Sequence, residues 1–140
     1  MFMLMAVNRP ITSPDDAALA ELCGELTARA EALDASGEWP AEQLRLCGEY
    51  GVYQWFNGEE WGGQAWDQES VLRGYLALSS ACLTTTFILT QRDGACRRIE
   101  SSENAELKSR LLPGLVHGEC VGETAVLHHS LCLQRPWARA

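Results

Sequence analysis

The chain has 140 residues, a formal net charge of −8 and a hydrophobic content of 46%. This length and apolar content are typical of one globular domain with its own core, and they exclude an intrinsically disordered protein. Nucleic acids are bound through clustered Lys and Arg. Here the basic residues are scattered and only Arg97 and Arg98 are adjacent, which excludes a nucleic-acid partner.

The cysteines indicate a reducing compartment. None of the six forms a C-x-x-C pair, and several fall on apolar helical faces, where a thiol behaves as a small hydrophobic group. We therefore expect a cytoplasmic protein. Residues 1–12 are expected to form a flexible N-terminus, because the apolar start has no basic flank and meets Arg9-Pro10 at once, unlike a signal peptide.

The first expected helix starts after Ser13, which would cap it, with Pro14 in the first turn. Apolar residues recur at helical spacing up to Leu33, Glu25 and Arg29 can pair along the wet side, and Ser36-Gly37 ends the helix. The apolar stripe consists of Leu19, Leu22, Cys23, Leu26, Ala30 and Leu33.

Two further helices flank a long loop. Pro40 opens a short helix that ends at Gly51, and residues 52–66, with several aromatic residues and glycines, have no helical period. Asp67 is expected to cap a third helix. The residues expected to be buried in this third helix are Val71, Leu72, Tyr75 and Leu76.

A fourth helix is expected from Ser80 to Arg98, and it is apolar on nearly all sides up to Gln91. No residue between Arg73 and Arg92 is charged, but the hydroxyl and amide groups in this stretch would be costly in lipid. The stretch is therefore interpreted as a buried central helix, with no membrane span.

Asn104 is expected to cap a fifth helix with Leu107, Leu111 and Leu115 on one side, which Pro113 ends or kinks. The sequence thus predicts an all-α fold, a five-helix bundle over residues 13–119, followed by an irregular tail at 120–140. In that tail Cys120, His128, His129 and Cys132 could be zinc ligands, but their spacing matches no structural zinc pattern, so we expect no metal site.

Three motifs in order carry a family resemblance between about residues 44 and 119: 47–52 (CGEYGV), 59–63 (EEWGG), and 102–108 (SENAELK) with the Leu-Pro and Gly-Glu pairs that follow. Together they resemble the N-terminal helical domain of the acyl-CoA dehydrogenases. The chain departs from the family at Gly58, where proline is usual, and at Glu103, where a glycine commonly ends a helix in a left-handed conformation. After residue 119 the sequence does not reproduce the family's flavin-contacting loop.

The resemblance implies FAD-dependent α,β-desaturation of an acyl-CoA. Counting back from Lys108, it implies that the fourth helix lines the acyl pocket through four substrate-binding residues, Thr86, Phe87, Thr90 and Gly94. The alternative is that Thr86 and Thr90 bond to carbonyls one turn back and that Phe87 is plain core.

We expect no catalytic residue within this chain and no retention of FAD by the chain alone, because the family's β-domain and catalytic carboxylate are not matched. Pairs such as Cys96 with Asp93, or a Cys with His117, lack a neighbouring oxyanion hole, and Gly62-Gly63 alone carries no nucleotide signal. The central helix should then leave an apolar flank for self-association or for a completing flavin-domain chain. The alternative function is a non-catalytic helical protein-interaction module.

Overall fold

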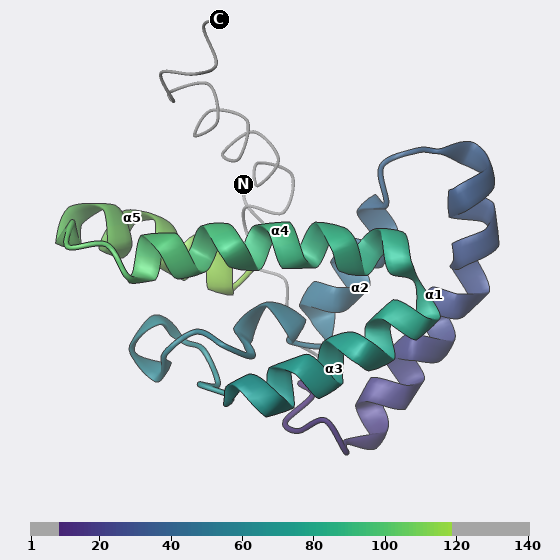
Figure 1. The fold of residues 1–140 in the computed structure, drawn as a ribbon, viewed down its shortest axis with the longest axis horizontal. Helices are drawn as coiled ribbons and strands as arrows, with labels where there is room; N and C mark the ends of the chain where they lie inside the picture. Colours follow the sequence, from purple (N-terminus) through teal and green to yellow (C-terminus); the bar gives the residue numbers. More distant parts are fainter. Residues whose placement is uncertain (1–8, 119–140) are drawn as a thin grey trace, which may run out of the picture.

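The computed structural model describes residues 9–118. The start of the expected flexible N-terminus, and the tail at 120–140 with its Cys/His group, lie outside these residues. Within them the fold is all-α, as the sequence predicts, with five helices and two short 3-10 turns (Figure 1). The elements are α1 (Ala17–Ser36), α2 (Ala41–Glu49), η1 (Val52–Gln54), η2 (Glu59–Trp61), α3 (Gln68–Ala81), α4 (Leu83–Glu100) and α5 (Ala105–Val116).

Helix α1 begins later than expected. Asp16, not Ser13, is the N-cap, because its carboxylate accepts a hydrogen bond from the Ala18 amide at 2.9 Å and another from the Thr12 amide. Ser13 instead accepts from the Asp16 amide in a turn before the helix. The other end agrees with the prediction, since Gly37 closes the helix at φ 64°.

The chain is anchored to the core before α1 starts. Ile11 is fully buried, and its amide donates to the carbonyl of Tyr50 at 2.9 Å. Ile11, which we expected to belong to the flexible segment of residues 1–12, is therefore packed against the core. This contact ties the N-terminal segment to the end of α2.

Helices α3 and α4 form an antiparallel hairpin, with α1 beside its closed end and the 52–66 loop and α5 at its open end (Figure 1). The break between them lies at Cys82, whose backbone is extended at φ −156°. Its carbonyl accepts from both the amide and the hydroxyl of Thr86. The expected start at Ser80 was thus wrong, because α3 continues through Ala81 and the cap follows it.

The buried side of α3 agrees only in part with the expectation. Val71 is buried and Tyr75 packs partly against the core, as expected, whereas Leu72 and Leu76 are 59% and 60% exposed and Gly74 and Leu78 face inward. The reason is Trp55, a fully buried side chain from the loop that lies directly over Gly74. A large ring needs a small partner, so the stripe containing the glycine, and not the leucines, packs inward.

Helix α5 begins as predicted, with the Asn104 side chain accepting from the Leu107 amide at 2.9 Å. Pro113 does not end the helix, because one further turn follows it, in which the Pro113 carbonyl accepts from the His117 amide at 3.0 Å. Glu103 needs no left-handed backbone, since the only non-glycine residue with positive φ among the described residues is Ala65. The turn is built differently, through the Ser102 hydroxyl accepting from the Asn104 amide.

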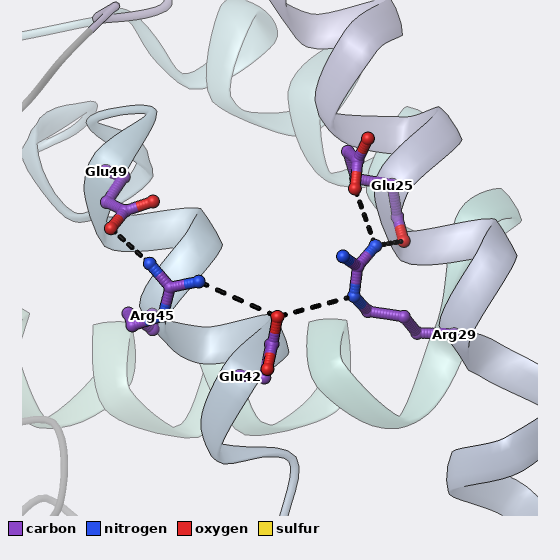
Figure 2. A network of polar contacts seen from close by, with 5 residues as sticks. All are labelled: Glu25, Arg29, Glu42, Arg45 and Glu49. Atoms are coloured by element: carbon purple, nitrogen blue, oxygen red, sulfur yellow. Dashed lines mark hydrogen bonds and ion pairs between the residues drawn. The ribbon is translucent and has the colours of Figure 1, made fainter.

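A surface network of ion pairs joins α1 to α2 (Figure 2). Arg29 contacts Glu25 at 2.6 Å on its own helix, as the sequence predicts, and Glu42 of α2 at 3.7 Å. Glu42 in turn lies 3.6 Å from Arg45, which pairs with Glu49. The network therefore links α1 to α2 at the surface.

None of the helices within residues 9–118 combines the length and apolar character needed to cross a membrane.

Candidate functional site: the α3–α4 groove

An open groove of about 400 Å³ runs between α3 and α4. Its α3 wall contains Gln68, Val71, Leu72 and Tyr75, and its α4 wall contains Thr90, Asp93, Gly94 and Arg97. Local sequence sets the start of the α3 wall, since Asp67 caps this helix by accepting from the Ser70 amide at 2.8 Å. The groove thus has apolar side chains on its α3 side only, and polar groups on both sides.

The structure separates the four predicted substrate-binding residues. Thr90 and Gly94 lie in the groove, but the Thr90 hydroxyl donates to the Phe87 carbonyl at 2.7 Å, which is the alternative expected for it. Thr86 does not lie in the groove, because it is 2% exposed and its hydroxyl donates to the Cys82 carbonyl at 2.9 Å, which is the alternative expected for it. Phe87 is neither core nor groove; it is 63% exposed on the outer face of α4.

Gly94 gives the groove its open centre. A β-carbon at this position would meet no atom within 4 Å. Glycine in a helix interior costs roughly 1 kcal/mol relative to alanine. Packing therefore does not require glycine here, and its effect is to keep space on the α4 wall.

Two polar groups on the groove walls lack partners among the described residues. The hydroxyl of Tyr75 and Oδ2 of Asp93 are both buried without a hydrogen bond. Burial raises the pKa of the Asp93 carboxyl well above its usual value, and the nearby positive charge of Arg97 offsets this only in part. Burial thus disfavours the charged form of this carboxyl.

Two arginines frame Asp93. The Arg92 guanidinium, 3% exposed, lies 4.1 Å from the centre of the Tyr53 ring and 3.8 Å from Oδ1 of Asp93. The Arg97 guanidinium lies at the groove and 4.7 Å from the centre of the Phe56 ring. At 3.8 Å the contact between Arg92 and Asp93 is too long for a hydrogen bond, so it leaves the carboxyl able to bond elsewhere.

The Gly62-Gly63 pair is a folding element of the loop. A β-carbon at Gly63 would lie 2.1 Å from the carbonyl oxygen of Asn57, and one at Gly62 would lie 2.9 Å from the His117 ring. The neighbouring Gly58 amide donates to Glu100 at the end of α4, which fixes the loop on the hairpin. A side chain at either position would thus meet neighbouring protein atoms, so the two glycines are required by the packing of the loop.

The thiol nearest to Asp93 is that of Cys96, which the sequence suggested as a possible partner of this carboxyl. The cysteines of residues 9–118 form no disulfide, and the Cys96 side chain near Asp93 is fully buried. Burial raises the pKa of the Cys96 thiol, which opposes formation of the reactive thiolate. Within the same residues no three His, Cys, Asp or Glu side chains are close enough to hold a metal ion.

Four large apolar side chains of the α3–α4 hairpin are exposed, and we refer to Leu72, Leu76, Leu83 and Phe87 as the apolar patch. Leu83 and Phe87 of α4 are 70% and 63% exposed, and the two leucines are one turn apart on α3. The bare apolar flank expected on the central helix is therefore present. A soluble monomer seldom leaves several large apolar side chains together in water without a binding role.

Reasoning from the sequence missed part of the groove. Asp93 and Arg97 are placed three and seven residues after Thr90, so helical spacing alone could have added them. Leu72 and Tyr75 were assigned to the core because an apolar stripe does not reveal which partner it faces. Only the position of Trp55 over Gly74 turns that stripe toward the groove.

Comparison with known proteins gives one informative result. The family model described as "Acyl-CoA dehydrogenase, N-terminal domain" matches residues 16–119. No curated protein and no solved structure gives a match. The matched span contains all five helices and both walls of the groove. Since it covers most of the chain, this protein belongs to the acyl-CoA dehydrogenase family through that N-terminal domain.

Proposed function

We propose that residues 16–119 form the N-terminal domain of an acyl-CoA dehydrogenase-like flavoprotein, and that the α3–α4 groove is its wall of the acyl site. The observation that carries this proposal is the groove on α4, where Thr90 and the open Gly94 face the apolar side chains of α3. The parent reaction is FAD-dependent desaturation between the α and β carbons of an acyl-CoA thioester.

The wall is not catalytic by itself in this proposal. The flavin and the base that removes the substrate proton are contributed by protein outside residues 16–119. The exposed apolar patch is the surface on which that flavin-binding part, or a second copy of the chain, packs in the cytoplasm.

Acyl-CoA binding tests the assignment of the groove. Gly94 and Gly24 are both exposed helical glycines at which a β-carbon meets nothing within 4 Å, but only Gly94 lines the groove. We expect the chain to bind a medium-chain acyl-CoA more tightly than free CoA in isothermal titration. Gly94→Leu should abolish this difference, and Gly24→Leu, the matched control, should retain it. A well-folded chain that binds acyl-CoA and CoA equally would instead be the behaviour of a non-catalytic interaction module.

The apolar patch gives a second test. The chain should self-associate in analytical ultracentrifugation or bind a hydrophobic fluorescent dye. The double substitution Leu76→Glu with Phe87→Glu should reduce both, because it places charge on the two arms of the hairpin. A monomer of the wild-type chain that binds no dye would count against a missing partner surface.

A further inference from the structure

Two buried polar groups in the α3–α4 groove make no hydrogen bond within the described part of the chain. Tyr75 projects from α3 and Asp93 from α4, and both line the same groove from opposite walls. Neither the Tyr75 hydroxyl nor Oδ2 of Asp93 has a hydrogen-bond partner among residues 9–118. An unpaired polar group removed from water normally costs about 1–3 kcal/mol, so a pair of them at one groove requires an explanation.

The surroundings determine which chemistry would satisfy these groups. Beside Tyr75 the α3 wall contains the apolar Val71 and Leu72, next to which an alkyl chain fits, and Gln68 at its start. Asp93 is 6% exposed, and burial raises the pKa of its carboxyl, which disfavours the charged form. The phenol of Tyr75 can donate or accept. A buried phenol and a buried carboxyl on facing walls suit an oxygen atom, carbonyl or hydroxyl, on an otherwise hydrocarbon chain.

We propose that Tyr75 and Asp93 select an oxygen-bearing acyl group, one with a hydroxyl or keto substituent on its alkyl chain, over a plain alkyl chain. This inference rests on the proposed function, since it takes the groove to be the acyl wall. The substituent oxygen bonds to the phenol and the carboxyl from between the two helices. Gly94, one residue after Asp93, leaves the space in which the substituted carbon lies. The two side chains are thus specificity-determining residues.

Affinity measurements on the full chain test this. The ligands are octanoyl-CoA and a set of hydroxyoctanoyl-CoA and ketooctanoyl-CoA isomers, with the Gly94 amide signal in heteronuclear NMR reporting occupancy of the groove. We expect at least one oxygenated isomer to bind about tenfold more tightly than octanoyl-CoA, the ratio that one good buried hydrogen bond supplies. Tyr75→Phe and Asp93→Leu should each remove most of that preference. Asp93→Asn, which still offers a donor, should keep it. Ser80→Ala, which removes an exposed hydroxyl of α3 away from the groove, is the control and should keep it as well.

The two proposals fail differently. If octanoyl-CoA shifts the Gly94 signal but every oxygenated isomer binds with the same affinity, the role of Tyr75 and Asp93 is overturned and the acyl wall stands. If no acyl-CoA shifts the Gly94 signal, the acyl wall fails and this inference fails with it. Should Asp93→Leu prove unfolded by circular dichroism, Tyr75→Phe decides, because removing the phenol oxygen leaves the ring and its packing on Trp55 in place.

Discussion

Replacing Gly74 by alanine should reveal how tightly the loop tryptophan is held against α3. A β-carbon at Gly74 would lie 2.5 Å from Cζ3 and 2.9 Å from Cη2 of Trp55. The tryptophan ring is fully buried and stacks on Trp66 with ring centres 4.6 Å apart. Tyr75 packs on the Trp55 ring as well, so two aromatic neighbours oppose a displacement of this ring.

The cost can be worked out from these distances. Carbon atoms pack best at about 3.5–4.0 Å, so the ring or the helix must shift by about 1 Å to admit the methyl group. Overpacking of this kind costs about 1–3 kcal/mol. Alanine in a helix interior returns about 1 kcal/mol relative to glycine. A matched variant, Gly94→Ala, has the same helical gain without the clash, since nothing lies within 4 Å of its β-carbon.

The difference between the two variants isolates the packing cost. We expect Gly94→Ala to be more stable than the wild type, and Gly74→Ala to be less stable than Gly94→Ala by about 1–3 kcal/mol. Urea unfolding followed by circular dichroism measures the free energies, and tryptophan fluorescence reports displacement of the Trp55–Trp66 stack. If the two variants unfold at the same urea concentration, the argument that Trp55 selects the glycine stripe of α3 is refuted.

Three further predictions concern charge and capping. Asp93→Asn should stabilise the protein at neutral pH, because the pKa of Asp93 in the folded state lies above its usual 3.8. The wild type therefore loses stability as the pH rises from 3.8 through the folded-state pKa, and the variant does not. Urea unfolding of both proteins at several pH values measures this, and parallel curves of stability against pH would contradict it. Asn104→Ala should cost about 1 kcal/mol in the free energy of unfolding, because the Leu107 amide loses its cap; an unchanged urea midpoint would show that the cap contributes nothing. Glu42→Gln, at the centre of the network in Figure 2, should lower the free energy of unfolding by less than about 1 kcal/mol at low salt and not at all in about 1 M NaCl, since its ion pairs are solvent-exposed. A loss of stability that persists in high salt would refute this account.

Local signals in the sequence predicted much of the fold correctly. Asp67 and Asn104 cap α3 and α5, Gly37 ends α1, and the leucines of the α1 stripe are buried. These features depend on residues within one helical turn of each other or on a simple period, so neighbouring sequence contains the information. Where two local signals competed, as between Ser13 and Asp16 at the start of α1, the choice was wrong.

The candidate site was only partly accessible in the same way. The family resemblance pointed to α4, and Thr90 and Gly94 lie in the groove, but Thr86 turns into the core and Phe87 lies outside. A count along one helix identifies a face to within a residue or two. It does not identify the opposite wall, and so Tyr75 and Leu72 were missed.

The sequence by itself determined that this protein is helical, where most of its helices begin and end, and to which family its domain belongs. The tertiary structure alone decided which side of α3 faces inward, which placed Leu72 and Leu76 in solvent and opened the groove. The physical reason is that Trp55, from a loop far from the middle of α3 in sequence, fits only over a residue without a side chain. Such a fit between distant segments depends on shape, which no local period encodes.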